Sequence, residues 1–134
     1  PFIWQASLGE KRLKVTLTML CTKAGIHGIL TGGELPHVGG VVLALPRRSL
    51  AHADQWSADL FIAPVPGHKD TDVAGRVASL LAKELKQPVV VSAGIHSDCL
   101  NAEEIQAIAF TCEQLGHRFL QWVEQNKQNK PEWR

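Results

Sequence analysis

The stretch Pro64-Val65-Pro66-Gly67-His68-Lys69-Asp70-Thr71-Asp72 separates an apolar run at residues 60–63 from a strongly helical pattern. Its prolines and glycine end the preceding segment, because proline has no backbone N–H and fixes its own φ. Asp70 or Thr71 then caps the helix, since either side-chain oxygen can accept a hydrogen bond from the first-turn N–H groups. A histidine and a lysine thus lie at the positive end of a helix dipole, where anions are favoured. We expect a phosphate or carboxylate site here; the alternative is an ordinary helix-initiating loop with solvated charges.

The helical pattern predicts the first of two long helices, over about residues 71–86. Pro88 blocks its continuation, and the β-branched run at residues 89–91 is typical of a short buried strand. Asn101 caps the second helix, with Glu104 in a capping-box pattern. The second helix keeps one apolar face, formed by Ile105, Ile108, Ala109, Cys112, Leu115, Phe119 and Val123.

The first part of the chain has the patterns of strands and turns. Apolar and polar side chains alternate through residues 11–22, which is typical of a half-buried strand. Residues 38–45 are apolar almost throughout and predict a central strand buried on both faces. The predicted segments are a strand at 11–22, a turn at 23–25, a return strand at 26–31, a third strand at 38–45 that Pro46 ends, a polar connection with a short helix at 50–58 and a short strand at 60–63.

This order of elements fits an α+β two-layer sandwich, a mixed sheet of about four to five strands with two long helices on one face. The other face carries the threonines of the first hairpin, and we expect solvent or a second subunit to cover it, hence a homo-oligomer. Residues 2–4 form an apolar arm, either an edge strand or a segment docked on a neighbouring subunit. We expect residues 1–134 to form one domain.

Composition argues against several classes of protein. The formal net charge of +1 gives no electrostatic case for binding nucleic acid or a membrane surface. No apolar run approaches the length of a membrane span, and we expect no signal peptide. The cysteines, Cys21, Cys99 and Cys112, are odd in number and form no C-x-x-C pair, which favours reduced thiols in a cytoplasmic protein.

Four histidines stand in or beside glycine-rich loops: His27, His37, His68 and His96. The loops around His68 and His96 follow strands that open at one edge if they are parallel, and the loop at residues 32–37 can join them there. Glycines let backbone N–H groups line a concavity for an anion, and imidazole and ammonium groups add protons or charge. Plainer explanations stay open: Gly32-Gly33 as hairpin chemistry, His27 as a structural or interface residue, and Asp98 as a capping residue.

Other catalytic and metal signatures are weak. Histidines and carboxylates suit several divalent ions, but no H-x-x-x-H or H-x-H spacing occurs, so we predict no metal site. Ser92 and Cys99 flank the His96 loop without a G-x-S-x-G elbow or a cysteine-protease signature. The P-loop and Rossmann patterns are also missing.

Four motifs together resemble the LpdD-like proteins, over about residues 13–120: Gly32-Gly33-Glu34-x-Pro36-His37-Val38-Gly39, Pro46-Arg47, Gly67-His68-Lys69-Asp70 and Ala93-Gly94-Ile95-His96-x-Asp98. These proteins are small accessory subunits encoded alongside UbiD-type aromatic-acid decarboxylases such as gallate decarboxylase. The resemblance implies a non-catalytic chaperone that binds prenylated FMN, or FMN, shields it and hands it to the decarboxylase. It implies a flavin prenyltransferase as a second candidate partner, and an α+β fold of the chorismate-mutase-like type.

The resemblance also implies the ligand-binding residues: Gly32, Gly33 and His37 from the first loop, His68, Lys69 and Asp70 from the second, and His96 and Asp98 from the third. Two positions depart from the family pattern: Gly40 replaces a slightly bulkier small residue, and Cys99 stands where an amide is common. Trp56 is the one candidate for stacking on a flavin ring.

Two other functions stay open. One is a small enzyme that uses His37, His68 or His96 as an acid or base on an aromatic or carboxylate substrate. The other is a structural subunit of the decarboxylase with no ligand of its own. The sequence leaves undecided the redox state of a bound flavin, the decarboxylase served, the oligomer number and whether a metal accompanies the phosphate.

Overall fold

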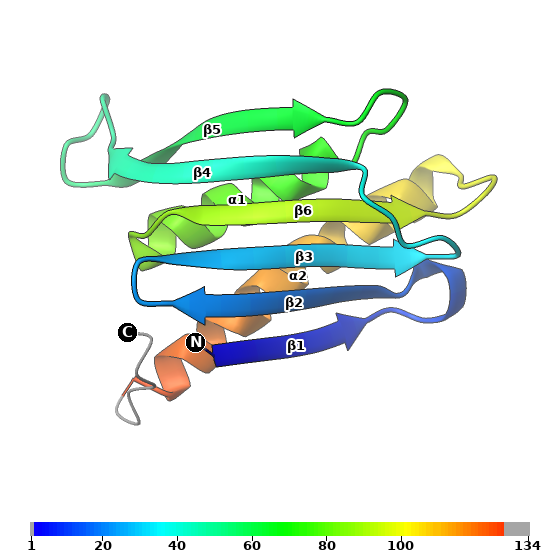
Figure 1. Ribbon diagram of the computed structural model, residues 1–134, viewed down its shortest axis with the longest axis horizontal. Coiled ribbons are helices and arrows are strands. Elements are labelled where there is room, and N and C mark those ends of the chain that lie inside the picture. Colours follow the sequence, from blue (N-terminus) through cyan, green and yellow to red (C-terminus); the bar gives the residue numbers. More distant parts are fainter. Residues whose placement is uncertain (1, 128–134) are drawn as a thin grey trace.

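One mixed sheet backed by two helices makes up the fold, seen through the sheet in Figure 1. The computed structural model describes residues 2–127; Pro1 and residues 128–134 are not described. The strands are β1 (Phe2–Leu8), β2 (Val15–Thr22), β3 (Gly25–Gly33), β4 (Gly40–Arg48), β5 (Trp56–Pro64) and β6 (Val89–His96), and the helices are α1 (Thr71–Leu85) and α2 (Ala102–Gln125). The sheet order is β1-β2-β3-β6-β4-β5.

The predicted α+β class and the two helices on one face are confirmed. The predicted strand count was too low, because the sheet has six strands. The additional strand is β1, which pairs antiparallel with β2 from Phe2 against Cys21 to Leu8 against Val15. The apolar arm is therefore an edge strand of this chain.

The alternation in the second strand is confirmed, although the strand starts later than predicted. Val15, Leu17, Met19 and Cys21 are fully buried against the helices. Before them, Lys11–Leu13 forms a short 3-10 turn, with Lys11 in the left-handed region at φ 53°. That turn takes up the residues predicted to begin the strand.

Strand β4 corrects two predictions. It is an inner strand, but it is buried on one face only: Val42 and Ala44 are fully buried, whereas Leu43 is 37% exposed, because both helices lie on one side of the sheet. The strand also continues past Pro46 to Arg48, since β5 pairs with it there. The predicted short helix at residues 50–58 is wrong, because the chain makes a hairpin turn and enters β5 at Trp56.

The carboxyl ends of β3, β5 and β6 meet at one edge of the sheet, on the right of Figure 1. Strand β3 is parallel to β6, and β4 is antiparallel to both β6 and β5, so β3, β5 and β6 run in the same direction. The predicted meeting of three loops at one rim is confirmed.

Helices α1 and α2 pack closely against each other, and a capping box starts α2. A Cβ atom on Gly116 of α2 would lie 3.3 Å from Leu80 Cδ2 of α1, so glycine permits this approach. The predicted capping box is confirmed, with Asn101 accepting from the Glu104 N–H and the Glu104 carboxylate accepting from the Asn101 N–H. Among the described residues, no helix is long and apolar enough to cross a membrane.

Candidate functional site

The side chain of Asp70 links the start of α1 to the end of β6. Asp70 stands at the N-cap position, but with helical φ and ψ of −66° and −17° its side chain makes no capping bond. Its Oδ1 atom instead accepts a hydrogen bond from the Ile95 backbone N–H at 2.9 Å. The predicted capping role of Asp70 is therefore wrong. The carboxylate is only 9% exposed and acts as a bridge between two loops.

Two histidines complete a cluster around the other oxygen of this carboxylate. His37 Nε2 lies 3.1 Å from Asp70 Oδ2 and 3.0 Å from His68 Nδ1. His68 Nδ1 is 3.9 Å from the same oxygen. The second ring nitrogen of His37, Nδ1, donates to the backbone carbonyl of Leu35 at 2.9 Å. Residues from two separate loops thus meet around one point, as the sequence predicted.

Glycines let the first loop lie directly on β6. The His37 N–H donates to the Gly94 carbonyl at 3.3 Å, and the Gly39 N–H donates to the Ala93 carbonyl at 2.8 Å. A Cβ atom on Gly94 would overlap the His37 carbonyl, and one on Gly39 would overlap the Asp70 carboxylate. These glycines set the position of His37 relative to Asp70.

The other glycines singled out from the sequence have packing roles. Gly33 adopts φ of +74°, and a Cβ atom there would overlap the carbonyl of His96. A Cβ atom on Gly32 would overlap the carbonyl of Lys14. A Cβ atom on Gly40 would overlap Thr71 Cγ2, so a bulkier residue there would require the Thr71 side chain to move.

A polar network that the sequence analysis missed holds the third loop. The buried Ser97 donates from Oγ to the Arg12 carbonyl at 2.7 Å and accepts from the Glu34 N–H at 3.1 Å. Arg12 Nη1 donates to the Asp98 carbonyl at 2.7 Å. The side chain of Asp98 contacts His96, whose Nε2 lies 2.9 Å from Asp98 Oδ1. Local sequence gave no sign of this network, because Arg12 and Ser97 are far apart in the chain.

A pocket of about 470 Å³ opens beside this cluster, between α1, α2 and the end of β6. Its polar side contains His68, Lys69, Asp70 and His96, all of them predicted site residues. Its apolar side, which the sequence analysis did not assign to the site, contains Val73, Ile95, Leu100, Ile105, Ile108 and Ala109. Ile105 is 56% exposed here, although the helix pattern suggested an inward position. No sequence signal marked Ile105 as a pocket residue, because it falls on the periodic apolar face of α2.

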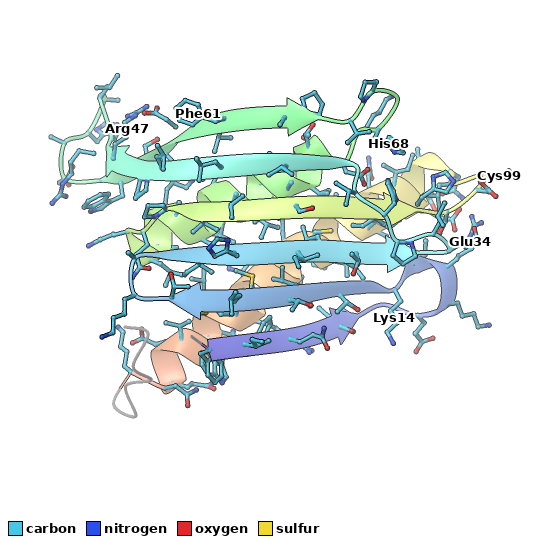
Figure 2. All side chains as sticks on the ribbon, viewed as in Figure 1. Lys14, Glu34, Arg47, Phe61, His68 and Cys99 are labelled. Carbon is cyan, nitrogen blue, oxygen red and sulfur yellow. The ribbon has the colours of Figure 1, made fainter. Side chains whose placement is uncertain are left out.

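Four predicted site residues do not line this pocket. Gly32 and Gly33 pack against backbone, and Asp98 is exposed beside His96. His37 contacts the pocket residues His68 and Asp70 but does not itself line the pocket. Figure 2 shows His68 at the same end of the molecule as Glu34 and Cys99, with Arg47 at the opposite end.

Trp56 lies away from the site, contrary to its predicted role as a stacking partner. It begins β5, whereas the site follows the other end of that strand at Pro64. Its ring contacts the guanidinium of Arg48 at 4.6 Å and Nζ of Lys86 at 5.3 Å from the centroid. Trp56 therefore packs against these two cations at the opposite end of β5 from the candidate site.

A second hollow, of about 520 Å³, lies between the C-terminal parts of α1 and α2. It is lined by exposed charged residues such as Glu84, Lys86 and Glu124, far from the three loops. The convergence of histidines, a buried carboxylate and an apolar wall favours the pocket beside Asp70 as the functional site.

Comparisons with known proteins find a matching family model and a similar fold. A family model described as the prenylated flavin chaperone LpdD-like domain matches residues 9–124. None of the curated proteins compared with the chain matches it. A chain of the "Crystal Structure of a Novel Chaperone Complex for Yeast 20S Proteasome Assembly" superposes with a TM-score of 0.51 at 12% identity, over 92% of this chain and 96% of that one. This last likeness concerns the fold alone, and the chorismate-mutase-like type stays a prediction.

Proposed function

Because the chain belongs to the prenylated flavin chaperone LpdD-like family, we propose that it binds prenylated FMN, or FMN, in the pocket beside Asp70. In this proposal it is a non-catalytic carrier in the cytoplasm, and residues 1–134 act as one domain. It receives the flavin from a flavin prenyltransferase and delivers it to a UbiD-type decarboxylase.

The observation that carries the proposal is the two-sided pocket. A prenylated flavin mononucleotide joins a large apolar ring system to a phosphate, and ligand pockets of about 300–1,000 Å³ commonly combine an apolar wall with a few polar groups. Here Leu100 and Ile108 belong to the apolar wall, and the exposed Lys69 and His68 offer donors on the opposite side. Each charge-assisted hydrogen bond to a phosphate contributes roughly 1.5–3 kcal/mol.

One contact favours a second function, acid–base catalysis. The His37 ring lies between the Leu35 carbonyl and the Asp70 carboxylate, an arrangement that fixes the orientation of an imidazole. Such an enzyme would turn over an aromatic or carboxylate substrate without flavin. A carrier would instead acquire a flavin absorbance when co-expressed with the prenylating enzyme.

The uncovered face of the sheet supports the proposed homo-oligomer. Leu20, His27, Val90, Leu43 and Phe61 lie side by side across five strands in register. Leu20 and Leu43 are each 37% exposed and Phe61 is 58% exposed. Exposed apolar rows of this kind mark protein–protein contacts, and we propose a second copy of the chain as the occupant.

The decisive experiment is anaerobic co-expression with a flavin prenyltransferase, followed by mass spectrometry of the released small molecule. Prenylated FMN should be recovered from the wild-type protein, and recovery should fall in His68→Ala and Lys69→Ala. The matched controls His52→Ala and Lys23→Ala change exposed residues in the turns at the opposite edge of the sheet, so flavin recovery should be unchanged. Equal recovery from all four variants would exclude this site.

A further inference from the structure

Three potential metal ligands face one another beside the pocket, and two of them line it. They are His37 Nε2, His68 Nδ1 and Asp70 Oδ2, and all three atoms lie within 4.8 Å of one another. Two of the three separations are 3.0 and 3.1 Å, and the third, from His68 Nδ1 to Asp70 Oδ2, is 3.9 Å. The ligands come from two loops and therefore show none of the sequence spacings by which metal sites are usually recognised.

The position of the ring hydrogen on His37 decides whether its Nε2 atom and the Asp70 carboxylate attract or repel each other. A backbone carbonyl can only accept, so the Leu35 carbonyl fixes the ring hydrogen of His37 on Nδ1. In the neutral ring, Nε2 then presents a lone pair to the carboxylate oxygen of Asp70, which also carries only lone pairs. Two acceptors at 3.1 Å repel each other unless a proton or a cation lies between them.

The separations fit a metal ion. Zinc binds imidazole nitrogen and carboxylate oxygen at about 2.0–2.2 Å in tetrahedral geometry, which places neighbouring ligand atoms about 3.3 Å apart. The observed separations of 3.0, 3.1 and 3.9 Å lie on either side of that value. Two imidazoles and one carboxylate form a donor set suited to zinc and to neighbouring divalent transition metals.

His37 and Asp70 each make the additional hydrogen bond that metal ligands in proteins usually make. A ligating histidine usually donates its second N–H to a carbonyl or carboxylate, as His37 donates to the Leu35 carbonyl. A ligating carboxylate is itself hydrogen-bonded, as Asp70 is through Oδ1 to the Ile95 N–H. These contacts hold two of the three ligands in place before any ion arrives.

We propose that His37, His68 and Asp70 bind one divalent transition-metal cation, with zinc as the reference ion. Three protein ligands leave a coordination position open, and two of them, His68 and Asp70, line the pocket. With neutral histidines, the three ligands carry the single negative charge of Asp70, and the positive charge that the pocket offers a phosphate comes from Lys69. A divalent cation makes the net charge positive, so the same rim attracts an anionic guest.

This inference goes beyond flavin binding and does not depend on it, because the ligand geometry belongs to the protein alone. The competing arrangement is a doubly protonated His37 paired with Asp70, which needs no metal. The two differ in a measurable way, since only the metal site binds zinc at a stoichiometry of one per chain in the absence of flavin.

The experiment is a titration of the metal-stripped, flavin-free protein with zinc, and in parallel with cobalt(II), near neutral pH. We expect one ion per chain, a zinc-dependent rise in Tm, and a cobalt absorption spectrum typical of low coordination number. His68→Ala removes an exposed ligand with little risk to folding and should weaken zinc binding by at least the roughly 10–100-fold that loss of an outer-shell partner typically costs. Asp70→Asn and His37→Ala should do the same.

His52→Ala is the matched control, because it removes an exposed histidine from the opposite edge of the sheet and should leave zinc binding unchanged. Circular dichroism checks that each variant is folded. The proposal is overturned if the wild-type protein binds no zinc, or if folded His68→Ala and His37→Ala bind it as well as the wild type does. Either result would favour the protonated His37–Asp70 pair. Neither result would bear on flavin binding through Lys69, which the Lys69→Ala variant tests separately.

Discussion

The carboxylate of Asp70 accepts a hydrogen bond from the backbone N–H of Ile95 at 2.9 Å, across 25 residues of chain. One oxygen of a single buried side chain thus ties the first turn of α1 to the end of β6, while the other faces His37. The relative position of the second and third loops depends on this bond. The shape of the pocket depends on it as well, because Asp70 and Ile95 both line it.

Replacement of Asp70 by alanine should therefore destabilise the fold as well as the site. The Ile95 N–H would lose its partner, and hydrogen bonds to charged groups contribute about 1.5–3 kcal/mol. We expect the free energy of unfolding, measured in urea, to fall by that amount. Asp98→Ala, which removes an exposed carboxylate nearby, should change it by less than about 0.5 kcal/mol. Equal effects of the two substitutions would contradict this role for Asp70.

Gly94→Ala should displace the first loop from β6. The added methyl group would overlap the His37 carbonyl, and such overpacking costs typically about 1–3 kcal/mol. Binding at the pocket should weaken together with stability, because His37 moves away from Asp70. Gly75→Ala is the control: its methyl group would have its nearest neighbour at 3.7 Å, and alanine is the better helix former. A Gly94→Ala protein as stable as Gly75→Ala would show that the loop is not held in this way.

Local patterns were sufficient to predict the elements that each bury one periodic face. The alternation through Met19 predicted the buried face and the end of β2 but not its start, and the capping box at Asn101 placed the start of α2. Prediction failed where pairing with a neighbouring strand outweighed a local signal. Pro46 did not end β4, and β5 begins at Trp56, ahead of the predicted strand at 60–63, because β4 and β5 pair along their whole lengths.

Prediction of the site also succeeded where the order of the elements decided the outcome and failed where contacts between distant residues did. Parallel strands brought His37 and His68 to one rim, as expected from the order of the elements. The predicted capping role of Asp70 was wrong, because its backbone is already helical, and the Ser97 network was missed, because its partners are distant in sequence. Contacts that depend on packing between distant segments leave no periodic trace in a single sequence.

The three cysteines should differ sharply in reactivity. Burial raises the pKa of Cys21 from its ordinary value of 9.0 to about 11 and that of Cys112 to about 12, whereas Cys99 is exposed. The thiolate is the reactive form, so we expect one labelled thiol per native chain and three after unfolding. Quantitative alkylation followed by mass spectrometry gives both numbers. Rapid labelling of Cys112 in the native protein would contradict the packing described for α2.

The same pKa shifts predict a loss of stability at high pH. A pKa raised in the folded state means that the unfolded chain releases its proton first as the pH rises. The contribution of Cys21 is therefore complete below pH 9.0 and is lost as the pH approaches about 11. In urea unfolding across this range, Cys21→Ala should show a shallower decline than the wild-type protein. An identical decline would show that this thiol does not titrate with unfolding.

Phe61→Glu should disrupt the proposed oligomer without unfolding the chain. Phe61 lies on the uncovered face of an edge strand and is 58% exposed, so a charge there has little cost in the monomer. Light scattering coupled to gel filtration should show a smaller particle than the wild type. Ile105→Glu, which places the same charge on an exposed isoleucine of the helical layer, should leave the mass unchanged. A wild-type monomer, or an unaltered mass in Phe61→Glu, would remove this face as the interface.

The central claim, that the pocket beside Asp70 holds a prenylated flavin, is tested most directly by anaerobic titration of the purified protein with prenylated FMN. We expect saturable binding, with an affinity lower by about tenfold or more in Lys69→Ala, as the loss of one charge-assisted hydrogen bond implies, and unchanged in Lys23→Ala. Absence of saturable binding, or equal affinity in these two variants, would contradict the account.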